Sequence, residues 1–329
     1  MEQFYVIGAQ QKNGVFKDWE QYEKGLILKV SPQQNTAQTC VKYVSPPEVL
    51  PNTNPSISFT AGTMEQNLLY VGTNTEMLVF SLPHFQRLGY VTLPCFNDIH
   101  HVRPSKSGNF LIVNTGLDMV LEVSSMGEIK KEWSVTGMDQ WKKFTMAMDY
   151  RKVATTKPHQ AHPNYCFQLG EDLWVTRCLQ KDAICLTKPG QKIDIGGDLI
   201  HDGIVAGKFI YFTQVTGKVV LVDRNTLKVT QVVDLNNITS SGKQLGWCRG
   251  IKVMDDDNDK VIVGFTRIRP AKKLQANGTM KWEGQYGTMP TRIACYNLRL
   301  GKLIWEQELE SYGMNAIYSI HLATCGEQI

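Results

Sequence analysis

Short runs of β-branched and aromatic residues alternate along the chain with turn-rich polar segments. The clearest unit, residues 199–235, contains four apolar runs: IVA, FIYFTQ, KVVLVD and KVTQVVDL. Runs of this length, closed by Gly, Asn, Asp and Lys, predict β-strands joined by tight turns, and amphipathic helical periodicity is nearly absent. Four such strands in succession predict an antiparallel meander, which is the blade of a β-propeller.

The same pattern recurs four more times, in residues 57–93, 98–135, 161–195 and 247–309. A further blade can be assembled from both ends of the chain, with YSIHLAT as its inner strand and FYVIGAQ, GLILKV and TCVKYVS as its outer strands. We therefore predict an all-β fold, a single six-bladed propeller domain over residues 1–329, with four-stranded antiparallel blades and closure by both termini. A seventh blade is the alternative if the segment from Thr136 to Pro158 contains strands.

Two insertions interrupt the repeat, at about residues 136–158 and 270–290. Long excursions from a compact repeat are often lids or binding loops. A surface extension without a function is an equally good interpretation of each.

Composition narrows the classes of function. The chain is 42% hydrophobic and 20% charged, with a net charge of +4 and no dense basic run. We therefore expect neither a nucleic-acid nor a membrane partner. The N-terminal residues show no basic and apolar signal pattern, and the eight cysteines form no CxxC pair. These features predict reduced thiols in a cytoplasmic protein.

The histidines are the first candidate for chemistry. Six of the seven fall where an inner strand would enter the central tunnel: His100, His101, His159, His162, His201 and His321. The starts of the inner strands converge on one axis, so residues distant in sequence become neighbours. Strand alternation lets only one of His100 and His101 face the tunnel, and it points His159 and His162 in opposite directions if that stretch is extended. We favour His101, with His100 as the alternative, and His162.

The blade alignment adds three residues to this group. His162, His201 and Cys248 fall at equivalent positions, and Asp202 and Arg249 follow one residue later. Converging imidazoles suit Fe, Zn or Cu. The leading hypothesis is a small-molecule enzyme with a transition metal held by His101, His162, His201 and His321, and Cys248 as a secondary candidate ligand. Catalysis would use His201, with Arg249 orienting an anionic group of the substrate and Asp202 orienting a histidine.

Three alternatives stay open. The same histidines could act without a metal, in acid–base catalysis or group transfer, with Arg249 holding an anionic substrate. Arg249 favours this alternative, because a fixed cation beside a divalent metal is unfavourable without a compensating anion. The propeller could instead be a non-enzymatic platform for protein partners. The polar residues could also merely line a water-filled channel.

The segment DIHHVRPSKSGNFLIVNTGLDMVLEVSSMGEI, residues 98–129, resembles the arylsulfotransferase-type propeller repeat, in which a His-containing strand precedes a G-N-x-L-V strand. The later segment around GWCRGIKV and KVIVGFTRIRP resembles uncharacterised bacterial propellers. The first resemblance implies six blades and metal-free sulfuryl transfer through a histidine. It gives such roles to the positions His101, His162, His201, Arg249 and His321. The chain departs from that family in showing no export signal.

Overall fold

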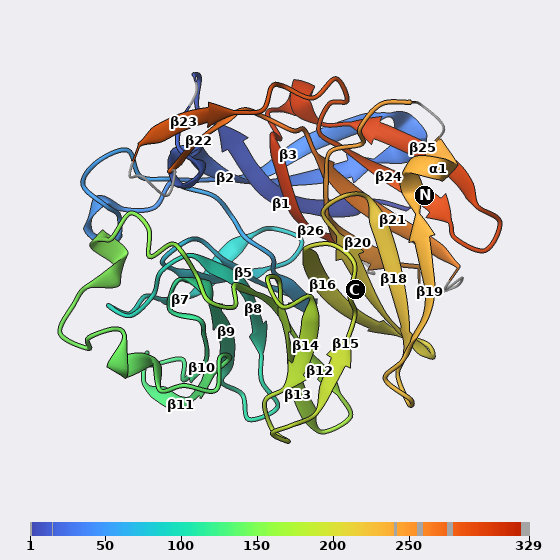
Figure 1. Cartoon of the computed structure of the whole chain (residues 1–329). Helices are drawn as coiled ribbons and strands as arrows, with labels where there is room; N and C mark the ends of the chain where they lie inside the picture. Colours follow the sequence, from blue (N-terminus) through green and yellow to red (C-terminus); the bar gives the residue numbers. More distant parts are fainter. Residues whose placement is uncertain (1, 15, 240–241, 255–258, 275–278, 324–329) are drawn as a thin grey trace.

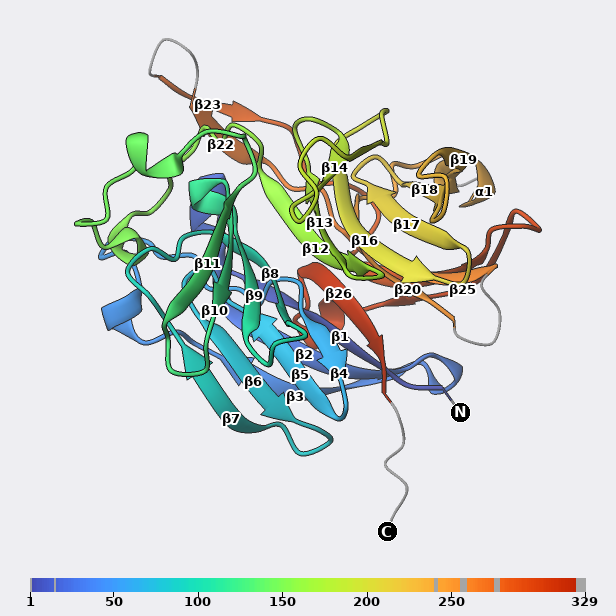
Figure 2. The same cartoon turned by 90° about the horizontal axis from the view of Figure 1, so that it is seen from below.

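The computed structural model describes residues 2–14, 16–239, 242–254, 259–274 and 279–323. Their strands form six four-stranded antiparallel sheets and one separate two-stranded hairpin. The sheets follow one another around a ring in the order of the sequence (Figures 1 and 2). In these residues the α-helical structure is limited to α1 (Leu235–Thr239). The predicted all-β propeller with six four-stranded blades is therefore confirmed.

Each blade runs from an inner strand near the axis of the ring to an outer strand at its rim. Blade 1 contains β4 (Thr63–Glu65), β5 (Leu68–Gly72), β6 (Met77–Ser81) and β7 (Gln86–Val91). Blade 2 contains β8 (Ile99–Pro104), β9 (Phe110–Asn114), β10 (Met119–Val123) and β11 (Ile129–Ser134). Blade 3 contains β12 (Pro163–Leu169), β13 (Asp172–Arg177), β14 (Asp182–Cys185) and β15 (Lys192–Asp194).

The second half of the ring repeats this plan. Blade 4 contains β16 (Ile200–Ala206), β17 (Phe209–Gln214), β18 (Lys218–Asp223) and β19 (Val229–Asp234). Blade 5 contains β20 (Trp247–Val253), β21 (Lys260–Thr266), β24 (Arg292–Asn297) and β25 (Lys302–Glu308). Blade 6 contains β26 (Ala316–Leu322), β1 (Phe4–Gln11), β2 (Tyr22–Ser31) and β3 (Thr36–Tyr43).

Blade 6 closes the ring with strands from both ends of the chain, as predicted. Val6 of β1 lies opposite Ile320 of β26 in an antiparallel pair. The hydroxyl of Ser319 on β26 accepts a hydrogen bond from the backbone N–H of Gly62, which joins blade 6 to blade 1. Opening the ring inside blade 6 would break the pairing of β1 with β26, and separating blade 6 from blade 1 would break the hydrogen bond from Gly62 to Ser319.

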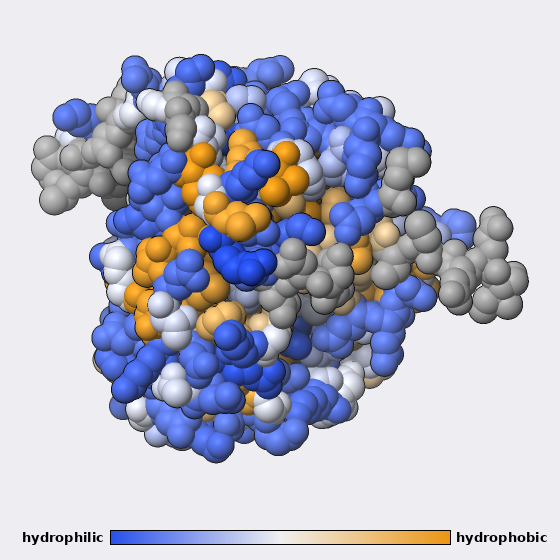
Figure 3. Space-filling model, turned by 90° about the vertical axis from the view of Figure 1, so that its right-hand side faces the viewer, coloured by the Kyte–Doolittle hydropathy of each residue, from blue (hydrophilic) through white to orange (hydrophobic). Residues whose placement is uncertain are grey.

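The hydrophobic core lies between neighbouring blades. Along β18, Val219 and Leu221 pack toward blade 5, whereas Val220 and Val222 pack toward blade 3. A middle strand is therefore covered on both faces, which is why these strands appear in the sequence as continuous apolar runs. The outer strands are much more exposed, and Val229 and Val232 of β19 reach the surface. Figure 3 shows apolar residues at the surface on that side of the ring, among larger hydrophilic areas.

Both insertions lie on the same face of the ring, at the top of Figure 2. Residues 136–158 contain two short 3-10 helices, η5 (Gln140–Lys142) and η6 (Tyr150–Lys152), and no strand, so this segment does not form a seventh blade. The described part of residues 270–290 contains the hairpin of β22 (Ala271–Leu274) and β23 (Met280–Glu283), which contacts η1 (Asp18–Glu20). The other 3-10 helices are η2 (Pro32–Gln34), η3 (Pro47–Val49), η4 (Thr115–Leu117) and η7 (Glu310–Tyr312). Among the described residues, no helix has the length and hydropathy needed to cross a membrane.

Candidate functional site

A pocket of about 230 Å³ opens at the axis of the ring, and we call it the axial pocket. Strands of blades 2, 4, 5 and 6 and loops that flank blades 1 and 3 line it, and the lining includes His100, His162 and His201. One wall comes from the end of the first insertion, residues 153–155 and Lys157, and another from Arg269, which directly precedes the second insertion. The two insertions therefore lie beside the axial pocket.

A β-bulge interrupts five inner strands next to these residues, and in β26 it falls at Tyr318, between Ile317 and Ser319. The pairing register shifts between Ile99 and His101, between Pro163 and Cys166, between His201 and Ile204, and between Cys248 and Ile251. His162, Asp202 and Gly250 accordingly have positive φ angles of 55°, 59° and 78°. A bulge adds a residue to one strand and turns its side chains away from simple alternation. Residues that lie next to each other in the sequence can therefore be directed to different surroundings.

His100, not His101, lines the axial pocket. Its Nδ1 lies 2.6 Å from Oδ1 of Asn164, and its Nε2 lies 3.3 Å from Oδ1 of Asp98. The amide nitrogen of Asn164 donates to the carbonyl of Ile200, which directs the amide oxygen toward the ring. Both ring nitrogens of His100 thus face oxygen acceptors, an arrangement that suits a doubly protonated imidazolium.

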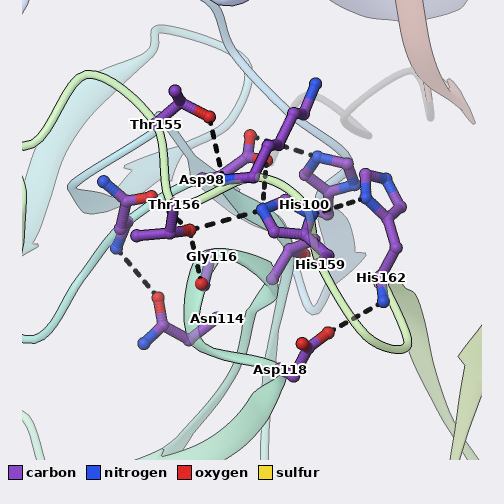
Figure 4. Close-up of polar contacts among 12 residues, drawn as sticks. Asp98, His100, Asn114, Gly116, Asp118, Thr155, Thr156, His159 and His162 are labelled. Atoms are coloured by element: carbon purple, nitrogen blue, oxygen red, sulfur yellow. Dashed lines mark hydrogen bonds and ion pairs between the residues drawn. The ribbon is translucent and has the colours of Figure 1, made fainter. Parts of the chain in front are cut away.

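His162 and His159 form a hydrogen bond through their Nδ1 atoms, 2.8 Å apart (Figure 4). The condition under which these two histidines would face opposite ways does not hold, because the backbone turns at His162 and is not extended there. Nε2 of His159 lies 3.3 Å from the hydroxyl of Thr156, and that hydroxyl donates to the carbonyl of Gly116.

The direction of this chain determines where the protons lie. The Thr156 proton is directed to Gly116, so the Thr156 oxygen accepts from Nε2–H of His159. In neutral His159, Nδ1 is then the acceptor and Nδ1–H of His162 is the donor. Nε2 of His162 is left as the unprotonated nitrogen of its ring, which is the form that a general base requires.

Asp118 holds the backbone that carries His159 and His162. Its fully buried carboxylate accepts hydrogen bonds from the N–H groups of Gln160, Ala161 and His162, at 2.8, 3.0 and 2.8 Å. Successive N–H groups that point to one anion form a nest, and such a nest fixes a loop in one conformation. Asp118 therefore positions the histidine pair without lining the axial pocket.

Charge and burial set the protonation of this cluster. Burial raises the pKa of Asp98, but His100, His159 and Lys157 outweigh burial and hold this pKa well below its usual value. Burial, followed by the adjacent His100, lowers the pKa of His162 well below its usual value. The rings of His100 and His162 meet edge to face, with centroids 4.8 Å apart. These shifts keep Asp98 ionised and His162 neutral.

Arg249 and His201 lie in the axial pocket, as predicted. Burial and then Arg249 lower the pKa of His201 well below its usual value, so this ring is neutral. The carboxylate of Asp202 accepts hydrogen bonds from Thr213 and from the backbone N–H of Gly250, and not from a histidine. Asp202 therefore ties the bulge of β16 to that of β20 and supports the backbone next to Arg249.

The structure separates the other predicted residues from this group. His101 is fully buried, stacks on Tyr165 with a centroid distance of 3.7 Å, and bonds to Thr63 and the Cys166 backbone. His321 lies beside Ser319 and does not line the axial pocket, and burial lowers its pKa to about 4. Cys248 is fully buried among apolar side chains between blades 4 and 5, and burial raises its pKa well above the usual value.

The predicted metal ligands His101, His162, His201 and His321 do not meet at one point. Only His162 and His201 line the axial pocket. Across the described residues, no group of three or more His, Cys, Asp or Glu side chains is arranged to hold a metal ion. Binding of Fe, Zn or Cu stays a prediction from the sequence.

Sequence reasoning missed two residues of the axial pocket, Asp98 and Arg269, and one contact of His159. Asp98 directly precedes β8 and has a positive φ angle of 50°, so strand alternation did not place it beside His100. His159 was among the candidate histidines, but its hydrogen bond to His162 was not predicted, because the alternation rule applies only to an extended stretch. Arg269 lies in a loop between β21 and β22 and had no local signal.

No protein-family model matches the chain, and no curated protein matches it. The fold is similar to the crystal structure of a protein of unknown function from Bacteroides caccae, with a TM-score of 0.61 and 12% identity over 98% of this chain and 99% of that one. A KlHsv2 variant with loop 6CD replaced by a Gly-Ser linker aligns over 76% of this chain and 66% of that one, with a TM-score of 0.40 and 11% identity. The first of these similarities supports the propeller fold. Any inference about chemistry must come from the residues of the axial pocket.

Proposed function

We propose that this protein is an enzyme that acts on a small anionic molecule in the axial pocket by metal-free acid–base chemistry. The observation that carries this proposal is the hydrogen-bond chain from Gly116 through Thr156 and His159 to His162. This chain leaves Nε2 of His162 as a proton acceptor in a ring that lines the axial pocket.

The assigned roles follow from the contacts. His162 accepts a proton from the bound molecule at Nε2. His100, paired with Asp98, places a positive charge beside the reacting group and stabilises negative charge that develops there. Arg249 binds the anionic part of the substrate. The arylsulfotransferase-type resemblance of residues 98–129 agrees with histidine chemistry on an anionic substrate.

The contacts of His100 also favour this proposal over a metal site. Both of its nitrogens lie within hydrogen-bond distance of side-chain oxygens, so neither is directed toward a shared ion. Nδ1 of His162 is likewise engaged by His159.

The test compares the wild-type protein with His162→Gln in a deproteinised metabolite extract, followed by mass spectrometry over time. We expect at least one small anionic compound to be consumed by the wild type, and about 100-fold or more slowly by the variant. His84→Gln is the matched control, because His84 is exposed and does not line the axial pocket. Equal consumption by wild type and His162→Gln, or none by the wild type, contradicts the proposal.

A further inference from the structure

Two arginines of the axial pocket are stacked between aromatic rings. The guanidinium of Arg249 lies 4.4 Å from the ring centre of Tyr318 and 5.9 Å from that of Trp247. The guanidinium of Arg269 lies 4.9 Å from the same Trp247 ring and 4.7 Å from Tyr22. Both cations are thus held against one indole ring, and all five residues line the axial pocket.

Among the described residues no carboxylate lies within ion-pair distance of either arginine, although Asp202 is near enough to Arg249 to interact with it electrostatically. Arg269 is only 7% exposed, yet its Nε and Nη1 have no hydrogen-bond acceptor there, and the same holds for Nε of Arg249. The aromatic rings attract the faces of the guanidinium groups, but they leave these N–H edges without oxygen acceptors. These unpartnered nitrogens have almost no accessible surface. Burying a cation in this state is unfavourable, and an anion bound to the remaining guanidinium nitrogens would offset that cost.

Other arginines of the fold show the contrast. Arg177 pairs with Asp182, and the buried Arg292 pairs with Glu306 at 3.0 Å. These are ion pairs that hold neighbouring strands together. Arg249 and Arg269 differ from them in turning toward the axial pocket without an ion-paired carboxylate.

The charges around the axial pocket indicate what is missing. Lys157 adds a third cation to the lining, and the carboxylates there are Asp18 and Asp98, of which Asp98 is already paired with His100. The two guanidinium groups therefore match a compact ligand group that has about two negative charges and several acceptor oxygens. A phosphate monoester carries a charge of about −1.5 to −2 at neutral pH and three such oxygens.

We propose that the axial pocket binds a small phosphate monoester whose phosphate lies between Arg249 and Arg269. This rests on the proposed function and names the class of its substrate. The pocket volume of about 230 Å³ is just below the range of about 300–1,000 Å³ that is typical of small-molecule sites. That volume holds a phosphate together with a short organic part, which faces the histidines.

The test measures binding of inorganic phosphate to the full-length protein by calorimetry and phosphorus NMR, with sulfate and malonate at matched ionic strength. We expect phosphate to bind most tightly, and more tightly at pH 8 than at pH 6, where less of it is doubly charged. Arg249→Gln and Arg269→Gln should each weaken phosphate binding about 30-fold or more, since each leaves a charged partner unpaired. Arg87→Gln, at an exposed arginine outside the axial pocket, should bind like the wild type.

Arg269→Lys separates an effect on folding from an effect on binding, because it keeps the positive charge and removes the planar guanidinium group with its several N–H donors. It should keep the wild-type melting temperature and bind phosphate with intermediate affinity. Sulfate or malonate binding as tightly as phosphate overturns the assignment, and so does wild-type affinity in both Gln variants.

His162→Gln should bind phosphate like the wild type while losing turnover. If this variant loses turnover but the wild type does not bind phosphate, the phosphate site is refuted and the proposed base is not. Normal phosphate binding together with unchanged turnover in this variant refutes the proposed base and leaves the phosphate site standing.

Discussion

The nest around Asp118 makes the sharpest prediction about the candidate site. Asp118→Asn keeps the shape of the side chain but removes its charge. One oxygen can still accept from Ala161 and His162, whereas the new amide nitrogen replaces the oxygen that lies 2.8 Å from the N–H of Gln160. Two donors then face each other in a region where Asp118 is fully buried.

The magnitude follows from the number of bonds. Three charge-assisted hydrogen bonds are replaced by at most two neutral ones, so the expected loss is about 2–4 kcal/mol of unfolding free energy. Asp139→Asn is the matched control. Asp139 is exposed and accepts one hydrogen bond, from the backbone N–H of Trp141, so its replacement should cost less than about 1 kcal/mol.

The measurement is urea unfolding followed by tryptophan fluorescence, with the change read from the midpoint at constant slope. Nitrogen NMR of the imidazoles provides a second readout, because the nest holds His159 and His162 in contact. Asp118→Asn should weaken the bond between their Nδ1 atoms, and Asp139→Asn should not. A stability loss in Asp118→Asn no greater than that in the control would refute this account of the loop.

Three further predictions concern protonation and metal binding. Thr156→Val removes the acceptor of Nε2–H of His159, so nitrogen NMR should show a changed proton distribution in His159 and His162. The control variant Thr155→Val should leave that distribution unchanged. Identical spectra for both variants would exclude the proposed hydrogen-bond chain. Burial raises the pKa of Asp202 from 3.8 to about 6, so ionising this carboxyl should lower wild-type stability by about 3 kcal/mol as pH rises from about 4 past 6. Asp202→Asn should lack that part of the pH dependence in urea titrations from pH 4 to 7, and parallel curves for the two proteins would contradict it. Treatment of untagged protein with a chelator should leave its melting temperature and turnover unchanged. If the chelator instead lowers the melting temperature, abolishes turnover and removes about one Fe, Zn or Cu per chain, the metal hypothesis is restored.

The architecture was predictable because it depends on a repeated local pattern. Each blade presents short apolar runs separated by turn residues, and the runs at the two ends of the chain complete each other as β26 and β1 to β3. The blade count followed from spacing alone. The insertion at residues 136–158 was the uncertain part, and it contains 3-10 turns and no strand.

The candidate site was predictable in part. His162, His201 and Arg249 do converge in the axial pocket. His101 was chosen over His100 by strand alternation, and the bulge between Ile99 and His101 makes alternation unreliable there. A bulge depends on how two strands pair, so a rule based on the spacing within one strand does not detect it.

The sequence by itself determined the class of fold, the number of blades, their closure by both termini and the approach of several histidines to one axis. These follow from apolar periodicity and turn residues, which act over a few positions. Only the tertiary structure decided the direction of each side chain at that axis, the proton order from Thr156 to His162, and the meeting of Arg269 with Arg249 at Trp247. Those outcomes depend on bulges, burial and contacts between blades, which exist only after the ring has closed.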